Sequence, residues 1–204
     1  MQFNRDSLFY KSAAGTAKIL GIRYFDSLYG EKNLKTDIPS VESPLEHQIR
    51  LASEEEIRDI AGIQGGDTLF RFEFAMRNGS SCYIARAGDK PAGFTWVNTR
   101  VMMMDMMKVI DVPPGGSFHF NSVVFPEFRR NKLFQSMIYF VYNDLKDKGY
   151  EFTGNFVDRD NIASIKAREH FNVLFQTARI GRLPGLPLFS IGRKFTPGAT
   201  LENP

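Results

Sequence analysis

The sequence predicts an α/β (α+β) domain in which strands and helices alternate, preceded by an N-terminal helical extension. Residues 118–171 run in the order strand, short basic turn, helix, strand and helix. Two hairpin patterns flank this unit, over residues 81–99 and 173–195, and each joins two apolar runs through a turn that contains glycine and proline. The chain has 204 residues, of which 43% are hydrophobic, so it can bury one core.

Residues 1–44 are expected to form an amphipathic helix and a linker ahead of the main domain. Within residues 7–29, apolar side chains recur on one helical stripe and lysines lie on another face. Three interpretations stay open: this helix packs on the domain or on a second subunit as a homodimer, it lies on an anionic membrane surface, or it is disordered. Residues 30–44 are rich in glycine, asparagine, proline and serine, which is typical of a linker.

The main domain is predicted over residues 45–196, beginning with a strand and two helices. Residues 47–51 alternate polar and apolar, as in a strand with one buried face. Ser53 and Glu56 have the spacing of a capping box, which predicts a helix that ends before a glycine pair. A second, phenylalanine-rich helix is expected over residues 68–77.

The single cysteine, Cys82, falls in the first strand of the 81–99 hairpin and is expected to be an inert thiol. One cysteine excludes an internal disulfide and is compatible with a reducing cytoplasm. The methionine-rich run 102–107 either forms an edge strand or loop packed on the hairpin, or lines an adaptable pocket. Residues 197–204 are expected to be a frayed tail.

The helix after the basic turn carries apolar residues at three- and four-residue spacing and ends at a glycine. These residues are Leu133, Met137, Phe140, Val141 and Leu145. A helix N-terminus that follows a tight turn presents free backbone N–H groups and the positive end of the helix dipole. This arrangement suits a phosphate or pyrophosphate.

The run Val-x-Pro-Glu-Phe-Arg at 124–129, followed by Asn-Ile-Ala-Ser at 161–164, resembles the GCN5-related N-acetyltransferases. The resemblance covers roughly residues 47–195. It implies a mixed, mostly antiparallel central sheet flanked by helices. It also implies that the turn after the central strand binds the pyrophosphate of acetyl-CoA, or of another acyl-CoA, and that no metal takes part.

The sequence departs from the family pattern at three places. Lys132 and Phe134 stand where the family has turn glycines, Arg168 replaces a tyrosine, and residues 172–173 replace Gly-Phe. Without the glycines, the turn is expected either to bind the phosphates without positive φ angles or to hold them less closely.

The resemblance assigns the cofactor-binding residues to three segments. Backbone N–H groups of the central strand would hold the pantetheine arm and polarise the thioester carbonyl, and those of the turn would take the pyrophosphate beside cationic side chains. A solvated basic turn, and a helix cap at the asparagine, are the structural alternatives. The predicted cofactor-binding residues are Ser122, Val123, Val124, Phe125, Arg129, Arg130, Asn131, Lys132, Leu133, Phe134, Asn161, Ser164 and Arg168.

For catalysis, His119 and Asn121 are expected to share one face of the central strand because strand side chains alternate. An amide cannot take a proton, whereas histidine has an ordinary pKa near 6.5. Asp105, Glu73, a water chain and a purely structural histidine stay open as alternatives. Arg168 cannot donate a proton, but it would stabilise a leaving thiolate or bind a cofactor phosphate.

The predicted function is a cytoplasmic N-acyltransferase that moves an acetyl group from CoA to a small primary amine. A likeness to bacterial acyltransferases of surface-polysaccharide synthesis implies a nucleotide-linked amino sugar as acceptor. The aromatic and methionine side chains of residues 70–76 and 102–107 would then wall the acceptor pocket. The alternatives are a long-chain N-acyltransferase that uses acyl carrier protein, and a non-catalytic CoA-binding or membrane-associated module. A net charge of +3 without a recognition motif does not indicate nucleic acid. No apolar run spans a bilayer, so membrane contact would be peripheral, at the inner face, through residues 7–29.

Overall fold

A computed structural model describes residues 23–104, 107–182, 189–190 and 195–202. The strands are β1 (Arg23–Asn33), β2 (Gln48–Leu51), β3 (Ser81–Ala87), β4 (Lys90–Asn98), β5 (Val101–Met104), β6 (Met107–Asp111), β7 (Gly116–Val124), β8 (Phe152–Asp158), β9 (Leu174–Arg182) and β10 (Phe189–Ser190). The helical elements are α2 (Glu54–Gln64), α3 (Thr68–Arg77), the short 3₁₀ turn η1 (Pro126–Phe128), α4 (Leu133–Asp147), α5 (Ile162–Glu169) and α6 (Ala199–Glu202).

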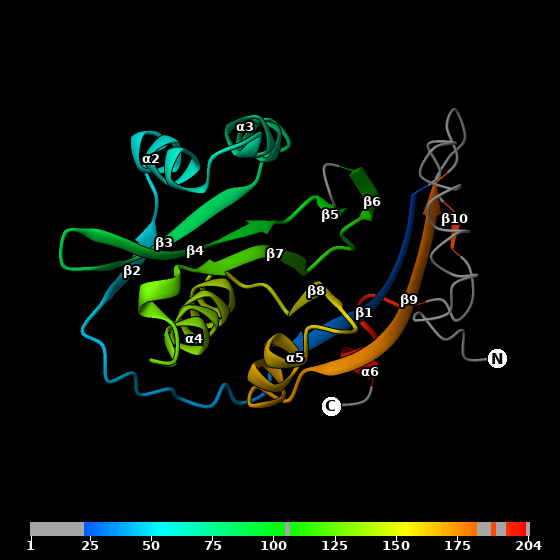
Figure 1. The fold of residues 1–204 in the computed structure, drawn as a ribbon. Coiled ribbons are helices and arrows are strands. Elements are labelled where there is room, and N and C mark those ends of the chain that lie inside the picture. Colours follow the sequence, from blue (N-terminus) through cyan, green and yellow to red (C-terminus); the bar gives the residue numbers. More distant parts are fainter. Residues whose placement is uncertain (1–22, 105–106, 183–188, 191–194, 203–204) are drawn as a thin grey trace.

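Within this part of the chain, eight strands form one sheet in the order β10-β9-β1-β8-β7-β4-β3-β2. Neighbouring strands are antiparallel except β7 and β8, which run parallel. Helices α2 and α3 lie on one face of the sheet, and α4 and α5 lie on the other (Figure 1). The expectation of a mixed, mostly antiparallel sheet flanked by helices is therefore confirmed.

The helix expected over residues 7–29 is wrong for residues 23–29, which belong to strand β1; residues 7–22 lie outside the described residues. β1 pairs with β8 along one edge and with β9 along the other, so Ser27 stands between Asp158 and Ala178. Backbone groups on both edges of β1 thereby find partners, and this long-range pairing outweighs the helical spacing of its apolar residues. The sheet consequently includes residues that were expected to lie in an extension.

The segment expected to be a linker, 30–44, is built into the domain instead. Its first four residues complete β1. Leu34 and Ile38 are then buried in one cluster with Val141 and Leu145 of α4. Since the segment buries apolar side chains in the core, it is a packed part of the domain.

The C-terminal tail expected to fray is also held in place, over residues 198–200. The buried carboxylate of Glu31 accepts hydrogen bonds from Tyr29 Oη at 2.7 Å and from the Gly198 N–H at 2.7 Å. It accepts two more from Thr200, from the N–H at 2.8 Å and from Oγ1 at 2.7 Å. Four donors on one carboxylate satisfy a charge that would be costly to bury alone.

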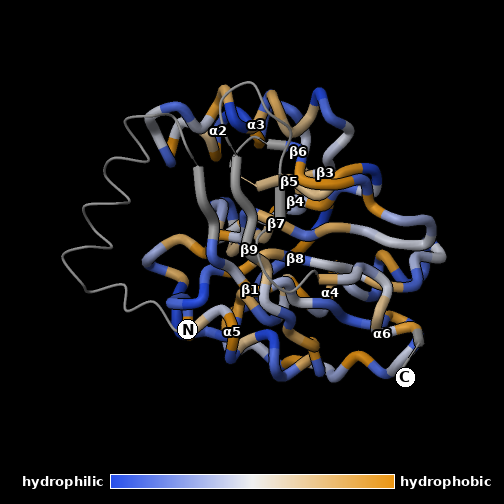
Figure 2. Tube along the Cα trace, turned by 90° about the vertical axis from the view of Figure 1, so that its right-hand side faces the viewer, coloured by the Kyte–Doolittle hydropathy of each residue, from blue (hydrophilic) through white to orange (hydrophobic). Residues whose placement is uncertain are grey.

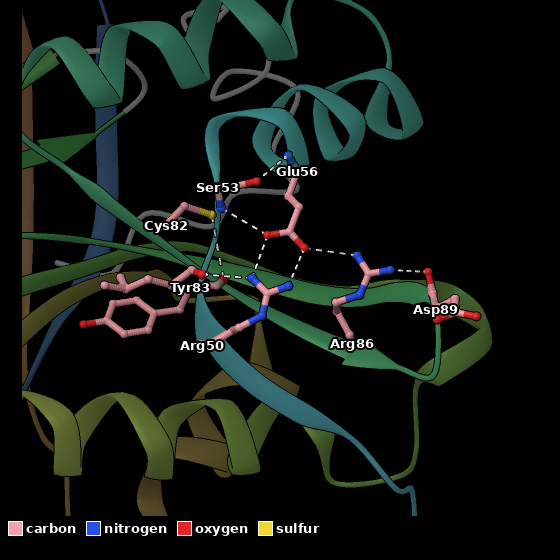
Figure 3. Close-up of polar contacts among 8 residues, drawn as sticks. Arg50, Ser53, Glu56, Cys82, Tyr83, Arg86 and Asp89 are labelled. Atoms are coloured by element: carbon pink, nitrogen blue, oxygen red, sulfur yellow. Dashed lines mark hydrogen bonds and ion pairs between the residues drawn. The ribbon is translucent and has the colours of Figure 1, made fainter.

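The capping box predicted at Ser53 and Glu56 is confirmed, with hydrogen bonds of 3.2 and 3.0 Å in the two directions (Figure 3). The same carboxylate binds both terminal nitrogens of Arg50 at 2.7 Å and Arg86 at 3.2 Å. These contacts lower the pKa of Glu56 to about 2, and the hydrogen bonds from Arg50 have the largest effect. They fasten the start of α2 to strands β2 and β3.

Apolar side chains pack on both faces of the sheet, and hydrophobic residues run through its central strands (Figure 2). The core under α2 and α3 contains Phe72, Phe94, Trp96 and Cys82. Burial raises the pKa of the Cys82 thiol, as expected of an inert cysteine. The methionine-rich run contributes to the separate β5–β6 pair, in which Met102 is fully buried. No described helix has both the length and the apolar character needed to cross a bilayer.

Candidate functional site

Strands β7 and β8 pair only at their beginnings and then separate. Residues 116–118 pair with 152–154, although β7 has nine residues and β8 has seven. Beyond these pairs, each strand is bonded in the sheet only to its outer neighbour, β4 or β1. We call the unpaired inner edges of residues 119–124 and 155–158 the split. An unpaired strand edge offers backbone donors and acceptors to a ligand.

The end of β7 aims backbone groups toward the split. The N–H of Phe125 donates to the carbonyl of Ala92 at 3.0 Å, so Phe125 faces β4. Because successive peptide groups of a strand alternate in direction, those of Val124 point away from β4. The Val124 carbonyl accepts a hydrogen bond from Arg129 Nε at 3.1 Å.

A bulge interrupts β7 at Asn121. Its φ is 47°, and the register between β4 and β7 shifts at this level. As a result, Asn121 lines the same cavity as Phe118 and Phe120, whereas the His119 ring meets Tyr142 of α4 on the opposite face, 6.3 Å between centroids. The expectation that His119 and Asn121 share a face is wrong, because a bulge breaks the two-residue alternation.

The basic turn before α4 contains two left-handed residues, Arg130 with φ 67° and Lys132 with φ 54°. Of the two expectations for a turn without glycines, the one without positive φ angles is therefore wrong, while less close binding of the phosphates remains a prediction. Each left-handed residue of this kind costs roughly 1–2 kcal/mol. Helix α4 starts at the next residue, without a side-chain cap. The N–H groups of Leu133, Phe134 and Gln135 have no hydrogen-bond acceptor among the described residues. Free N–H groups and exposed cations favour an anion here.

A buried polar cluster lies between the split and helices α4 and α5. Arg168 of α5 is only 4% exposed, and its guanidinium carbon lies 4.9 Å from the centre of the Phe134 ring. It donates to Ser164 Oγ and, at 3.4 Å, to the Ser164 carbonyl. Burial lowers the pKa of Arg168 and raises that of Tyr142 to about 12.

On the opposite face of the sheet is a cavity of about 540 Å³ between β4, β7, β8 and α3. Its wall is largely aromatic, and polar residues stand at one side. Trp96 is fully buried, and its Nε1 has no hydrogen-bond partner in the described part of the chain. Asp67 and Arg71 form an ion pair of 2.9 Å. The lining residues are Gln64, Asp67, Thr68, Arg71, Phe72, Phe74, Ala75, Phe94, Trp96, Met103, Met104, Phe118, Phe120, Asn121 and Phe156.

No protein-family model and no curated protein matches the sequence. Solved structures do match. The GCN5-related glucosamine N-acetyltransferase region of a fungal multi-domain β-N-acetylglucosaminidase has a TM-score of 0.58 at 13% identity, over 86% of this chain and 23% of that one. A GCN5-related N-acetyltransferase from Kribbella flavida gives 0.53 at 14% identity, over 84% and 65%. The chain has the GCN5-related N-acetyltransferase fold.

A third structure of this fold contains CoA. The Bacillus subtilis acetyltransferase in complex with CoA has a TM-score of 0.51 at 15% identity, over 65% of this chain and 80% of that one. The present chain thus spans about two thirds of the Kribbella protein and about a quarter of the fungal one. At these identities the comparisons establish the fold alone.

In this acetyltransferase fold, some of the predicted cofactor-binding residues are exposed, and others already contact other residues of the domain. Arg129, Arg130 and Lys132 are exposed on the turn. Ser122 Oγ lies 2.8 Å from Thr95 Oγ1. Three others take part in packing or backbone bonding: Val123 packs against the aromatic core, Leu133 is buried under the hairpin, and the Asn131 carbonyl accepts a hydrogen bond from Ser43 Oγ at 2.7 Å.

The contact of Asn161 with the cofactor arm remains a prediction. In the structure, the side chain of Asn161 caps a helix. Asn161 Oδ1 accepts the Ser164 N–H at 3.1 Å and caps α5, which is the structural alternative named for this residue. The Ser164 hydroxyl is in turn an acceptor for Arg168.

The catalytic candidates are not brought together. His119 is 1% exposed, and its Nε2 lies in hydrogen-bond contact with Thr95 and, at 3.0 Å, with Ser122 Oγ. Burial, and then the charge of Arg168, hold the pKa of His119 well below its usual value, so the ring is neutral. Asp105 lies outside the described residues, and Glu73 pairs with Arg77 at 3.7 Å.

The aromatic and methionine runs 70–76 and 102–107, expected to wall an acceptor pocket, do line this cavity through Phe72, Phe74, Met103 and Met104. Sequence reasoning missed the side of the cavity that strands β4 and β7 supply. Its signal was present: Phe118 and Phe120 alternate on one strand, and Phe94 and Trp96 alternate on the neighbouring one. Alternating large aromatics on paired strands place four rings on one face of the sheet.

Proposed function

We propose that the chain is an N-acyltransferase that moves an acyl group from a CoA thioester to a primary amine. The observation that carries this proposal is the split, whose strand β7 leads through η1 into the uncapped N-terminus of α4. The pyrophosphate would lie on the free N–H groups of α4 beside Arg130 and Lys132. The pantetheine arm would enter the split and bond to the Val124 peptide groups, as an added strand does.

The acceptor amine would reach the thioester from the aromatic cavity on the other face. Asn121 connects the two regions, because the bulge places it in the cavity wall at the level of the split. The amine nitrogen would attack the carbonyl carbon, the carbon–sulfur bond would break, and the thiolate would leave with the bonding electrons. The amine proton would pass to water, since His119 is buried, lies on the opposite face, and is a weak base because its pKa is well below the usual value.

The cavity supports an acceptor with a flat or ring-shaped body and hydrogen-bonding groups. Aromatic walls stack on such a body, and the unpartnered Trp96 Nε1 offers a donor to it. Asp67 and Arg71 would meet its polar groups. An amino sugar linked to a nucleotide fits this description, and we keep it as the proposed acceptor in surface-polysaccharide synthesis, in the cytoplasm where acyl-CoA is available.

A second candidate function is transfer of a longer acyl chain from acyl carrier protein. It is favoured by Met103 and Met104, which line the cavity and can repack around a flexible chain. The exposed cations Arg129, Arg130 and Lys132 would then face the acidic carrier. Rates with acyl groups of increasing length separate the two candidates, because the first predicts a preference for acetyl.

Calorimetric titration of acetyl-CoA, CoA and a longer acyl-CoA tests the donor site. The double variant Arg129→Ala, Lys132→Ala should weaken binding of all three. The matched control, Arg58→Ala with Lys108→Ala, removes the same charge from exposed positions elsewhere and should bind normally. No binding to any of the three by the unaltered protein would rule out the proposed function.

Turnover then tests the acceptor. A panel of amines that includes nucleotide-linked amino sugars should contain at least one substrate. The Trp96→Phe variant should raise the KM for that amine and leave the affinity for acetyl-CoA unchanged. Tight CoA binding without turnover of any amine would favour a non-catalytic CoA-binding module.

A further inference from the structure

In the part of the chain that the structure describes, the guanidinium of Arg168 is a buried charge without a counter-ion. None of the described carboxylates forms an ion pair with it. It contacts the Phe134 ring and the two Ser164 oxygens, and its Nε has no partner within the described ranges. Charges taken out of water are normally paired, because desolvation of an isolated ion costs several kcal/mol.

Two further buried side chains at the split have a nitrogen without a partner among the residues that the structure describes. These are Nδ1 of His119 and Nδ2 of Asn155, in residues that are 1% and 3% exposed. The pairing of Ser117 with Thr153 places Asn155 across from His119, where the strands part. Asn155 also shares the sheet face of Val173, which packs in the core under α4.

Arg168, His119 and Asn155 together form what we call the Arg168 cluster. Burial lowers the pKa of His119 on β7 and raises that of Tyr142 on α4, and the charge of Arg168 then lowers both pKa values. Buried polar atoms in native proteins nearly always have partners, so three nitrogens without a partner among the described residues, on the α4 and α5 side of the split, indicate that a ligand belongs there.

The position of the cluster restricts the ligand. The pyrophosphate of a donor already meets exposed cations and free N–H groups on the turn, whereas Arg168 is 4% exposed and lies beneath it. An anion that needs Arg168 must therefore arise inside the split. The proposed reaction forms one such anion, the thiolate.

We propose that Arg168 holds the CoA thiolate as it leaves, in place of a side chain that would protonate it. This inference rests on the proposed function. When the tetrahedral intermediate collapses, the carbon–sulfur electrons move to sulfur, the amide forms, and the sulfur anion pairs with the guanidinium. No proton is transferred in this step. The pKa of a free thiol, near 8.5, makes its anion a good leaving group, and a guanidinium strengthens hydrogen bonds to anions without donating its proton.

The test measures the ionisation of CoA bound to the protein. Thiolate absorbance in the ultraviolet is followed against pH for free CoA, for CoA bound to the unaltered protein, and for CoA bound to Arg168→Gln. We expect the thiol of bound CoA to ionise at least about tenfold more readily than that of free CoA, a shift of one unit. Arg168→Gln should remove this shift, Arg168→Lys should keep part of it, and the surface control Arg58→Gln should keep all of it.

Desulfo-CoA, which lacks the sulfur, distinguishes the thiolate from the phosphates. Arg168→Gln should bind desulfo-CoA as the unaltered protein does, while losing the preference for CoA that grows with pH. Equal weakening of CoA and desulfo-CoA, or an unshifted thiol in the unaltered protein, would overturn the inference and leave the proposed function standing. Failure of the unaltered protein to bind either ligand would overturn the proposed function itself.

Discussion

Replacing Lys132 by glycine should stabilise the protein while weakening its hold on an anion. Lys132 caps α4 with φ 54° and ψ 13°, a left-handed conformation. For a residue with a Cβ this conformation costs roughly 1–2 kcal/mol, and glycine adopts it freely. Glycine loses about 0.5–1 kcal/mol of this gain through its greater freedom in the unfolded chain.

The variant Lys132→Ala isolates the backbone effect. Both variants remove a cation from a helix N-terminus, where it opposes the dipole, so both should gain about 0.5 kcal/mol from charge. Alanine keeps the strained backbone, and glycine should exceed it by about 1 kcal/mol, or roughly 2–4 °C in Tm for a chain of this size. Urea and thermal unfolding measure the difference.

The affinity for acetyl-CoA should fall equally in the two variants, because each loses the same charge. Equal stability of Lys132→Ala and Lys132→Gly would refute the argument, since the strain at Lys132 would then be no larger than the roughly 0.5–1 kcal/mol that glycine loses through its freedom in the unfolded chain. A larger loss of affinity in the glycine variant would show that the rigidity of the turn, as well as its charge, supports binding.

Three other substitutions probe features that hold the site in place. Glu31→Gln should cost about 3 kcal/mol, since a charged acceptor of four hydrogen bonds is lost, and should speed hydrogen exchange of the Thr200 amide; unchanged exchange would contradict this. Glu56 has a depressed pKa, so the stability that it contributes is complete above about pH 5 and is lost as the pH falls toward about 2. The urea midpoint of Glu56→Gln should therefore change less with pH over that window than the midpoint of the unaltered protein. The same pH dependence in both proteins would contradict this prediction. A Cβ at Gly93 would lie 2.7 Å from the Val123 carbonyl oxygen. Gly93→Ala should therefore destabilise the protein by about 1–3 kcal/mol and weaken acyl-CoA binding. Unfolding at the same urea concentration as the unaltered protein would show that β7 shifts to make room for the methyl group.

The elements that the sequence predicted well are those with strong local signals. The capping box at Ser53 and the glycine after α4 mark helix ends whatever surrounds them. Strand β7 is an apolar, β-branched run, and helix α4 has a clear three- and four-residue period. The basic turn was located because it lies between that run and the start of the helical pattern.

The rest depends on contacts between distant segments. Residues 23–29 have helical spacing, but their partners in β8 and β9 are more than a hundred residues away and decide for a strand. The bulge at Asn121 places its side chain on the sheet face opposite to that of His119, and the local sequence does not mark this bulge. Left-handed Arg130 and Lys132 were missed because glycine and asparagine signal that conformation, whereas arginine and lysine do not.

The central position of β1 has a consequence for how the chain folds. β1 joins β8 to β9, and Glu31 closes over Thr200, so the earliest described strand completes its pairing only with the latest segments. Such high contact order slows folding and leaves β1 with unpaired edges until those segments have been synthesised. During synthesis on the ribosome, strands β2 to β7 could pair with one another while β1 remained unpaired. In that state β1 could aggregate or bind a chaperone. Closure of the half of the sheet that contains β8, and with it of the split, would then be the last event of folding.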